Sequence, residues 1–459
     1  MKFTEGETTV SREKFRTRFG FILVSAGCAI GIGNVWKFPY VAGENGGGIF
    51  VLFYFLFLLT MGIPVLTTEL AIGRATGQST VKAYRTLEKN SHKWHIHGFV
   101  SLAGCFILMS YYTTVSGWML GYFFKYLIGA FEVATNDPSM IFYGMLASPG
   151  EMLLLTGITV FIGIIVCGMG LQNGVERITK IMMTGLLLLI SILVIRCLTL
   201  DGAANGLRFF LLPDAEKAAE KGIGSIMTAA MTQAFFTLSI GLASMEIFGS
   251  YMPKDRTITS ESLKICLLDT FVAVMSGFVI FPACFSFGIN PDSGPSLVFI
   301  TLPKVFSHMT GGRIWGALFF LFMTFASIST VIAVFENLIA SGIDNYNWSR
   351  KKSSVINGIL FSAGSIPCIF GYNILKNTTV IGARNIPDSL DFIVSNLLLP
   401  VGALICLFFC TTDYGWGFDN YINEVNTGKG IKLSRKLKPY FSFILPVMII
   451  IVFVAGLLK

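Results

Sequence analysis

The segment Gly27-Cys28-Ala29-Ile30-Gly31-Ile32-Gly33-Asn34 interrupts an apolar run that extends from about residue 17 to residue 44. Each glycine weakens an α-helix by about 1 kcal/mol relative to alanine, so these glycines predict a break in the helix. A second, less sharp interruption, Phe236-Thr237-Leu238-Ser239-Ile240-Gly241, lies in a later apolar run. Irregular backbone at membrane depth is tolerated only where it is buried in protein or lines a cavity. The two segments therefore indicate broken membrane helices around a buried site.

The composition around these breaks is that of a membrane protein. Of the 459 residues, 53% are hydrophobic and only 13% are charged, about half the charged share of a soluble domain. These figures exclude a disordered chain and an ordinary cytosolic enzyme. Eleven runs are long and apolar enough to cross a bilayer as helices, which predicts an all-α membrane protein. We expect these spans at about 17–44, 48–73, 98–129, 151–170, 176–198, 223–250, 259–289, 313–344, 353–372, 388–411 and 440–458.

The two breaks fall in the first and the sixth predicted spans. That spacing matches a fold of two five-helix repeats with opposite topology, in which broken helices at corresponding positions mark a transport site. We expect a single transmembrane domain, 1–459, with one repeat at about 17–198, a second at about 223–411 and an additional helix at about 440–458. The spacing Gly27-x-x-x-Gly31 also fits close helix packing, and this alternative stays open on the pattern alone.

The basic residues predict the orientation in the membrane. With a cytoplasmic N-terminus, most of the Lys and Arg side chains lie on the inner side, whereas the outer segment 130–150 has none. This is the distribution of the positive-inside rule. The formal net charge of +8 is therefore a matter of topology and does not indicate nucleic-acid binding. An odd number of spans places the C-terminus outside the cell.

Polar side chains inside the spans are few and are mostly hydroxyls, amides and carboxylates. They are Asn34, Lys37, Glu44, Glu69, Tyr112, Gln233, Thr237, Ser239, Asp269, Ser329, Thr330 and Glu336. Such oxygen ligands suit an alkali cation better than zinc or copper, and ionisable groups in spans usually mark ion or substrate paths. For any single Ser or Thr, a hydrogen bond within its own helix is the alternative. No catalytic arrangement or phosphate-binding loop accompanies the set, so we expect no enzyme.

Several further motifs follow one another along nearly the whole chain. They are Arg18-Phe19-Gly20, Gly27 to Lys37 with Phe38-Pro39, Glu44-Asn45-Gly46-Gly47-Gly48, Gly62-Ile63-Pro64 with Glu69 and Gly73-Arg74, Tyr111-Tyr112, Gln233 to Gly241, and Gly294-Pro295-Ser296-Leu297-Val298-Phe299 through Leu302-Pro303. In these motifs the chain resembles the neurotransmitter:sodium symporter family, and among its members the bacterial transporters with eleven helices. The resemblance implies a LeuT-like fold and sodium-coupled transport of amino acids.

The resemblance also implies two sodium sites, each an all-oxygen cage, for one or two ions. Site one would use the Ala29 carbonyl and the side chains of Asn34, Thr237 and Asp269, completed by the substrate carboxylate. Site two would use the carbonyls of Gly27, Ile30 and Ala326 and the hydroxyls of Ser329 and Thr330. Because the first ion would share a ligand with the substrate, each would improve the binding of the other.

The same resemblance implies a substrate pocket. Amides near Gly31 and Gly33, with the Tyr112 hydroxyl, would bind a carboxylate. Carbonyls of Ala29, Phe236, Thr237 and Ser239 would take an ammonium group, and the side-chain subsite would be Cys28, Leu108, Phe236, Leu242, Ser327, Val331 and Val334. This subsite carries no charge, so apolar burial favours hydrophobic substrates, either aliphatic or aromatic. Amine-transporting relatives have an acidic residue at the Gly31 position, so we expect a substrate that brings its own carboxylate.

Two residues depart from the family pattern near the first sodium site. Asp269 stands where Asn is usual, and Ala273 lacks the hydroxyl that chloride-dependent members use. Those members hold the anion at this position together with the positions of Tyr54, Gln233 and Thr237. A fixed carboxylate could take the place of chloride, so we expect chloride-independent transport. A protonated Asp269 that only forms hydrogen bonds is the alternative.

Two gates follow from the resemblance. Lys37 and Asp391 would form the outer ion pair, with Tyr112 and Phe236 as the lid over the substrate. Lysine replaces the usual arginine and lacks its forked, two-point geometry. The inner gate would be an ion pair of Arg12 with Asp344, supported by Phe15, Ser250, Tyr251 and Glu336.

These features together predict a symporter that imports hydrophobic L-amino acids with sodium across a prokaryotic cell membrane by alternating access. Its partners would be the substrate, sodium ions and lipid, with no nucleic acid. The alternatives are a channel and a non-transporting amino-acid sensor of the same fold. The polar residues cluster near mid-membrane depth, which disfavours a channel, and no signalling domain is recognisable, which disfavours a sensor.

Overall fold

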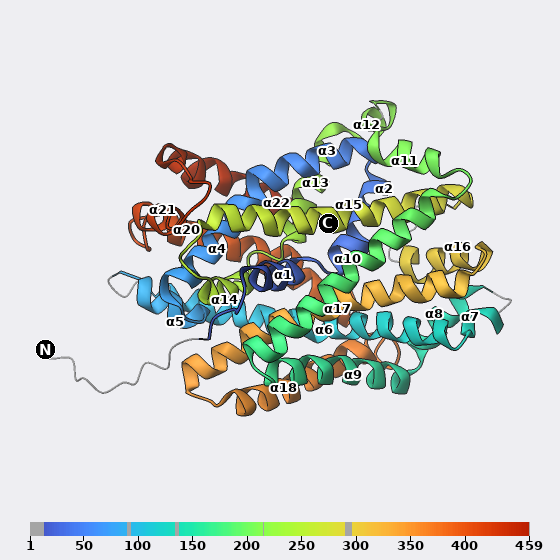
Figure 1. Ribbon diagram of the computed structural model, residues 1–459, viewed down its shortest axis with the longest axis horizontal. Helices are drawn as coiled ribbons and strands as arrows, with labels where there is room; N and C mark the ends of the chain where they lie inside the picture. The colour runs from blue at the N-terminus through green and yellow to red at the C-terminus, as the bar shows by residue number, and fades with distance from the viewer. Residues whose placement is uncertain (1–12, 90–92, 134–136, 214, 290–295, 459) are drawn as a thin grey trace, which may run out of the picture.

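The computed structural model describes residues 13–89, 93–133, 137–213, 215–289 and 296–458, and this part of the chain is a bundle of helices (Figure 1). Nine continuous helices within these residues are long and apolar enough to cross a membrane. They are α3–α4 (Gly48–Thr76), α6 (His95–Leu127), α9 (Pro149–Gly168), α10 with its leading turn (Leu171–Leu198), α15 (Ile258–Ser286), α17 (Gly312–Tyr346), α18 (Arg350–Phe370), α19–α20 (Ile386–Thr411) and α22 with its leading turns (Arg435–Leu457).

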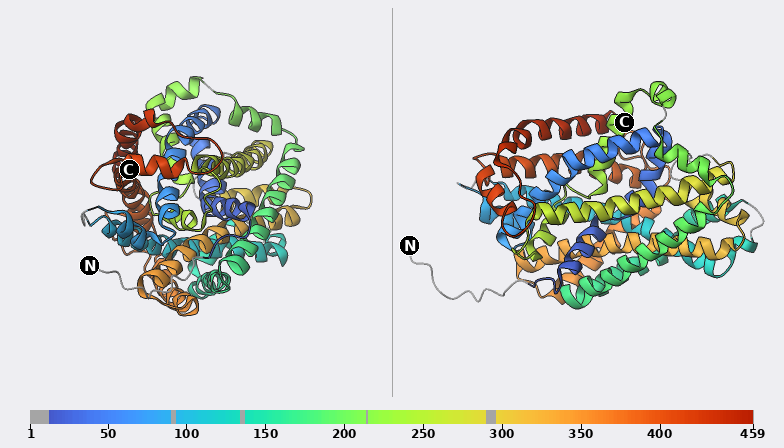
Figure 2. Two further views of the ribbon diagram at one scale, coloured as in Figure 1. Left: turned by 60° about the vertical axis from the view of Figure 1, so that its left-hand side comes forward. Right: turned by 45° about the horizontal axis from the view of Figure 1, so that its top comes forward.

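A tenth span is broken where the sequence predicts it. Helix α1 (Arg18–Ala29) and the segment that ends in α2 (Gly33–Glu44) are bent by 58° at a short interruption. In Figure 2 the dark blue α1 is surrounded by the other helices of the bundle. The break therefore lies inside the protein, where its irregular backbone is shielded from lipid.

The sixth predicted span consists of two helices that are each too short to cross a bilayer alone. Helix α13 (Ile223–Thr237) packs on α3 (Gly48–Phe57), and α14 (Ser244–Tyr251) packs on α4 (Ile63–Thr76). Because α3 and α4 are the two halves of one continuous span, α13 and α14 together cross the same depth. The described part of the chain thus agrees with the eleven predicted spans, whose ends fall within five residues of the predicted ones.

In the described part of the chain, five wide, π-helical turns end two residues before a proline. The turns are Gly33–Lys37, Leu58–Gly62, Leu297–Thr301, Ile393–Leu398 and Tyr440–Ile444, followed by Pro39, Pro64, Pro303, Pro400 and Pro446. Proline has no N–H and its ring collides with the carbonyl one turn earlier. A locally widened turn accommodates that collision and re-satisfies the backbone without ending the helix.

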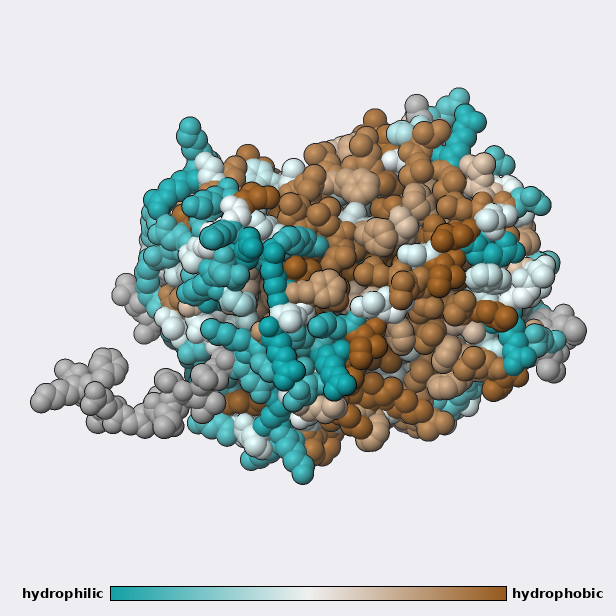
Figure 3. Space-filling view, viewed as in Figure 1, coloured by the Kyte–Doolittle hydropathy of each residue, from teal (hydrophilic) through white to brown (hydrophobic). Residues whose placement is uncertain are grey.

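Short helices cover the two ends of the bundle. They are α5 (Thr80–Leu87), α7 (Ala130–Val133), α8 (Pro138–Ala147), α11 (Ala203–Leu211), α12 (Ala215–Lys221), α16 (Leu302–His308) and α21 (Phe418–Val425). We call the two ends the α5 end and the α16 end. Figure 3 shows a broad apolar band across the long helices, with hydrophilic side chains gathered mainly at the α5 end on the left and more thinly at the α16 end.

Helix α17 forms the centre of the bundle. In its most apolar window 83% of the residues are buried, against 33% in Arg435–Leu457 at the periphery. It packs along α6, α10, α9 and α1. Polar groups of α17 therefore face protein rather than lipid, and one of its faces borders the break after α1.

Candidate functional site

The backbone at both breaks departs from helical geometry. Helix α1 ends at Ala29, and Ile30 is extended, with ψ of 103°. After α13, Ser239, Gly241 and Ala243 all have positive φ angles, of 52°, 106° and 56°. A Cβ atom at Gly241 would lie 2.1 Å from the carbonyl oxygen of Leu399, so only glycine fits this position.

Glu69 of α4 holds the second break open. Its carboxylate accepts hydrogen bonds from the backbone N–H groups of Gly241 (2.5 Å) and Met245 (3.2 Å), and the side chain is fully buried. These N–H groups have no helical partners at the break and at the start of α14, and a buried carboxylate is a strong acceptor for them. Glu69, to which the sequence analysis assigns no role, thus positions the backbone of the second break.

Three of the predicted site-one side chains meet in a buried cluster between the two breaks. Asn34 donates its amide hydrogens to Asp269 Oδ1 (2.7 Å) and Thr237 Oγ1 (3.0 Å), and the Thr237 hydroxyl donates to Asp269 Oδ2 (2.9 Å). The Asn34 amide oxygen accepts from the backbone N–H of Gly31 at 3.1 Å. Ala29, the fourth predicted ligand, is the last residue of α1.

Asp269 has no basic partner within the residues that the structure describes. Neither a lysine nor an arginine forms an ion pair with it there, and its side chain is fully buried. An ionised carboxylate is costly to bury unless a cation or several donors accompany it. The two donors, Asn34 and Thr237, leave the negative charge itself uncompensated by protein, so the cluster suits a small cation or a proton.

The five predicted site-two residues also converge. The Thr330 hydroxyl lies 3.2 Å from the carbonyl oxygens of Gly27 and Ile30 and 3.3 Å from that of Ala326. Ser329 donates to the Ala326 carbonyl at 2.9 Å. A hydroxyl carries one hydrogen and cannot satisfy three carbonyl groups at once. The converging oxygens therefore form a second cradle that suits a hard cation.

Several predicted substrate residues border the first break. The Tyr112 hydroxyl accepts the N–H of Ile32 at 3.2 Å, and a Cβ atom at Gly31 would lie 2.6 Å from that hydroxyl. Ser239 donates to the Cys28 carbonyl at 3.3 Å. The Phe236 ring passes within 3.5 Å of the Cβ position of Gly33. These contacts bring both breaks and α6 to one place.

Other predicted pocket residues have contacts elsewhere. Val331 approaches α9, where a Cβ atom at Gly163 would lie 3.2 Å from it, and the Ser327 hydroxyl accepts from Ser116 of α6 at 2.8 Å. Leu242 packs against Gly104 of α6. Leu108 of α6 is half-buried, and Val334 of α17 is buried.

The predicted outer gate is arranged around two separate interactions. The Lys37 ammonium lies 3.5 Å from the centroid of the Phe236 ring, a favourable cation–π arrangement. Asp391 accepts hydrogen bonds from the hydroxyls of Tyr111 and Ser395, each at 2.9 Å. The hydrogen bond of Tyr111, the neighbour of the predicted lid residue Tyr112, with Asp391 was not predicted from the sequence. The Lys37–Asp391 ion pair stays a prediction.

At the α5 end, the residues predicted for the inner gate separate into two groups. Tyr251 donates to Glu336 at 2.7 Å, and the Phe15 ring meets the Tyr251 ring edge-on at 5.8 Å. Asp344 instead accepts the backbone N–H of Ser79 at 2.7 Å. Ser250 donates to the carbonyl of Ile247 in its own helix, and the predicted partner Arg12 lies outside the described residues.

Arg350 is a partner of Glu336 that the sequence analysis did not identify. Its guanidinium binds both carboxylate oxygens of Glu336, at 2.8 and 3.1 Å, and also donates to the Cys167 carbonyl. The sequence shows it only as one of several basic residues at an inner loop. A fully buried acid such as Glu336 is stabilised by a cationic partner, so its place inside a span was a signal for a nearby base, although the sequence alone does not show which one.

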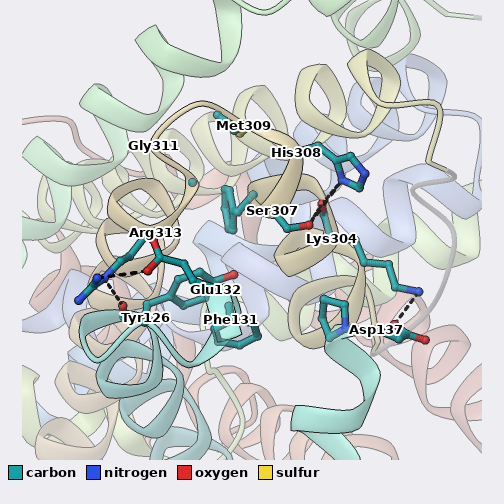
Figure 4. A pocket seen from close by; sticks show the side chains of 14 residues that line it. Tyr126, Phe131, Glu132, Asp137, Lys304, Ser307, His308, Met309, Gly311 and Arg313 are labelled. Carbon is teal, nitrogen blue, oxygen red and sulfur yellow. Dashed lines mark hydrogen bonds and ion pairs between the residues drawn. The ribbon is translucent and has the colours of Figure 1, made fainter. Parts of the chain in front are cut away.

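A surface pocket lies away from the breaks, at the α16 end (Figure 4). It has a volume of about 800 Å³, and ion pairs of Lys304 with Asp137 (2.9 Å) and of Arg313 with Glu132 (3.3 Å) cross its rim. Hydrogen bonds from Ser139 and then from Lys304 lower the pKa of Asp137 to about 2. These pairs join α7 and α8 to α16 and α17.

Comparisons with known proteins agree with this arrangement. Residues 12–137 and 141–459 match the family model described as the sodium:neurotransmitter symporter family. The sodium-dependent transporter YhdH of Bacillus subtilis is 34% identical over 96% of each chain, and a sodium-dependent transporter of Haemophilus influenzae is 32% identical over 97% of this chain and 98% of its own.

A solved structure has the same architecture. The crystal structure of MhsT in complex with L-phenylalanine superimposes with a TM-score of 0.85 and 34% identity, covering 97% of this chain and all of that chain. Among more distant relatives, the sodium- and chloride-dependent GABA transporter 2 of mouse is 24% identical over all of this chain and 82% of its own length.

Proposed function

The chain belongs to the sodium:neurotransmitter symporter family, and from this premise we propose that it imports hydrophobic L-amino acids together with sodium, without a need for chloride. It is a multi-pass membrane transporter with the LeuT-like fold and not an enzyme. The substrate class, the sodium ligands, the chloride independence and the orientation are parts of the proposal.

The buried cluster of Asn34, Thr237 and Asp269 carries the proposal. It places carboxylate and hydroxyl oxygens between two broken helices, with no basic partner for Asp269 among the residues described. A sodium ion there would supply the missing positive charge. The carboxylate of an amino acid bound at the Gly31 and Gly33 amides would then be the remaining ligand.

This shared ligand would couple the two fluxes. Sodium would hold the substrate carboxylate, and the carboxylate would complete the coordination of sodium, so that each raises the affinity for the other by the same factor. The second cradle, around Thr330, joins α1 to α17. A cation at that place would link the mobile broken helix to the central helix of the bundle.

The local geometry favours a substrate with its own carboxylate. A side chain at position 31 would collide with Tyr112 and Thr330, because a Cβ atom would lie 2.6 and 2.8 Å from their hydroxyls. The chain therefore offers no acid there for a substrate amine. The structural relative MhsT is solved with L-phenylalanine, and the half-buried Leu108 and Phe236 offer apolar surface to a substrate of that kind.

The anion-binding positions support chloride independence. Ala273 is buried and has no hydroxyl, while Asp269 already supplies a negative charge beside Thr237. A chloride ion next to that carboxylate would be repelled, since like charges at short range are unfavourable in a buried site. The carboxylate would itself balance the sodium charge.

Transport would proceed by alternating access with the N-terminus in the cytoplasm. Helices of spans 1, 2, 6 and 7 would rock against the rest of the bundle. The two five-helix repeats, at about 17–198 and 223–411, would be the units related by inverted topology. The α5 end would then face the cytoplasm and the α16 end the outside.

Uptake into proteoliposomes tests the proposal. The purified protein would be given radiolabelled L-amino acids under an inward sodium gradient, with gluconate replacing chloride and choline replacing sodium in the control. We expect concentrative uptake of phenylalanine and other hydrophobic amino acids that is lost in choline. Uptake only when chloride is restored would refute the role of Asp269, and better competition by charged amino acids would refute the pocket.

A further inference from the structure

Helix α14 carries a second buried carboxylate, Glu246, that the proposed transport site does not use. Its side chain is fully buried, and Tyr84 of α5 donates a hydrogen bond to its Oε1 at 3.0 Å. The other oxygen, Oε2, is buried and has no hydrogen-bond partner among the described residues. A buried ionised carboxylate with a single donor is strongly unfavourable.

Two more polar atoms close to Glu246 are also unsatisfied. The Thr80 hydroxyl lies beside the Glu246 carboxyl group, and its oxygen is buried without a hydrogen bond in the described structure. His97 packs edge-on against the Tyr84 ring at 5.3 Å, and its Nδ1 is likewise buried and unbonded. Buried polar groups are normally paired, and one hydrogen bond between the Glu246 carboxyl group and the Thr80 oxygen would pair two of these atoms with each other.

No basic side chain forms an ion pair with Glu246 among the residues described. The titratable side chains around it are Glu69 on α4, Tyr84 on α5, His97 and Cys105 on α6, and Cys406 on α20. The charged groups of the other contacting helices are engaged elsewhere: Arg18 with Glu261, Arg74 with Glu424, Glu336 with Arg350, and Asp344 with Ser79.

Of the two neighbouring carboxylates, Glu69 is the one that can remain ionised. Glu69 accepts two backbone N–H groups, one in the break and one at the start of α14, whereas Glu246 has the hydroxyls of Tyr84 and Thr80 beside it and accepts from no backbone group among the described residues. Two nearby buried carboxylates do not both ionise readily. A proton is therefore the occupant that best fits Glu246.

We propose that Glu246 is a proton-binding site that is filled while α14 is packed on α4 and α5, and is emptied when this end of the bundle opens. The proton would be bonded to Oε2, and this O–H would donate a hydrogen bond to the Thr80 oxygen. That hydrogen bond gives a partner both to Oε2 and to the Thr80 oxygen. On opening, water would hydrate the carboxyl group, and the proton would pass to that water and leave a carboxylate. The link to opening rests on the alternating-access function proposed above, whereas the proton site does not.

The sign of the coupling follows from this assignment. A group that is protonated in the closed state and ionised in the open state shifts the equilibrium towards the closed state as pH falls. A lower pH at the α5 end should therefore slow opening at that end. A glutamine at this position resembles the protonated acid permanently and should remove the dependence.

Infrared spectroscopy of the purified protein tests the proton site without any transport. We expect a C=O band of a protonated carboxyl group that shifts in D2O, is lost in Glu246→Gln and persists in Glu261→Gln. Glu261 is the matched control, since it is equally buried but paired with Arg18. Tyr84→Phe should shift the band by removing the hydrogen bond to Oε1, which keeps the assignment testable if Glu246→Gln does not fold. Absence of such a band, or an unchanged band intensity in Glu246→Gln, would overturn the proposal.

Proteoliposomes test the coupling. With the outer pH fixed, the internal pH would be varied while sodium-driven phenylalanine uptake is measured. We expect uptake by the wild type to slow as the internal pH falls, and uptake by Glu246→Gln to be insensitive. Equal pH dependence in both would refute the coupling, and absence of uptake by the wild type would count against the proposed function while the infrared result still decides the proton site.

Discussion

Asp269 determines the charge of the site between the two broken helices. It is fully buried and is held by Asn34 and Thr237, so its contribution to cation binding is not screened by water. Two unit charges 4 Å apart interact by about 4 kcal/mol at the effective dielectric typical of proteins. A residue of this kind has its effect through charge more than through shape.

We predict that Asp269→Asn weakens sodium-driven uptake in gluconate by at least about tenfold, because the neutral amide no longer balances the ion. The double variant Asp269→Asn/Ala273→Ser, which adds the missing hydroxyl, should regain activity only in chloride. Uptake in paired chloride and gluconate media measures this.

The single variant Ala273→Ser is the matched control and should remain independent of chloride, since the carboxylate is intact. Full activity of Asp269→Asn in gluconate would show that Asp269 serves only as a hydrogen-bonding group, as a protonated acid would.

The contacts of single residues could be predicted from the sequence where a motif marks them. Asn34, Thr237 and Asp269 lie on three helices, and the structure brings them within hydrogen-bonding distance. Arg350 could not be recognised in this way, because its partner Glu336 is on the preceding helix and only the fold brings the two together. The approach of Val331 to Gly163 of α9 was likewise not predictable, because it depends on how the helices pack, and its place in the substrate pocket stays a prediction.

At the scale of helices, the breaks were predictable and their exact form was not. The glycines at positions 27, 31 and 33 indicate the first break, and the structure bends the span by 58° there. The second break depends on long-range contacts, since Gly241 is pressed against the Leu399 carbonyl and bound by Glu69. Proline chemistry alone does not predict the wide turns, because Pro282 and Pro367 lie inside α15 and α18 without one.

We predict that Gly241→Ala lowers the thermal stability in detergent by several degrees and abolishes uptake. Alanine would have to adopt a φ of 106° with its Cβ 2.1 Å from a backbone oxygen. Non-glycine residues in such regions cost of order 1–3 kcal/mol even without a collision.

Gly157→Ala is the control for this change. Gly157 lies inside α9, and no heavy atom lies within 4 Å of its Cβ position. Alanine there should leave uptake intact and stabilise the helix by up to about 1 kcal/mol. An unchanged melting temperature for Gly241→Ala would mean that the second break does not require a glycine.

At the scale of the whole molecule, transport depends on which end of the bundle is closed. At the α5 end, contacts join distant segments, including Phe15 on Tyr251, Tyr251 on Glu336 and Arg350 on Glu336. No local pattern contains this network, because its members come from the N-terminal segment, α14, α17 and α18. The family resemblance indicates Phe15, Tyr251 and Glu336 as residues of this end, but it indicates neither Arg350 nor the contacts that join the four residues.

We predict that Arg350→Gln destabilises the closed α5 end, because it leaves Glu336 charged, buried and bound only by Tyr251. Removing one partner of a buried ion pair costs about 3–5 kcal/mol, and the true value should lie at the low end, since Arg350 is 19% exposed. The melting temperature in detergent should fall, and uptake should decrease as the bundle spends more time open at this end.

The double variant Arg350→Gln/Glu336→Gln should recover most of the lost stability, because no unpaired charge remains. Arg435→Gln, which removes an exposed pair with Asp419, should change the stability little. If the double variant is no more stable than Arg350→Gln, Arg350 acts through its contacts with the Cys167 carbonyl and Glu13 rather than through Glu336.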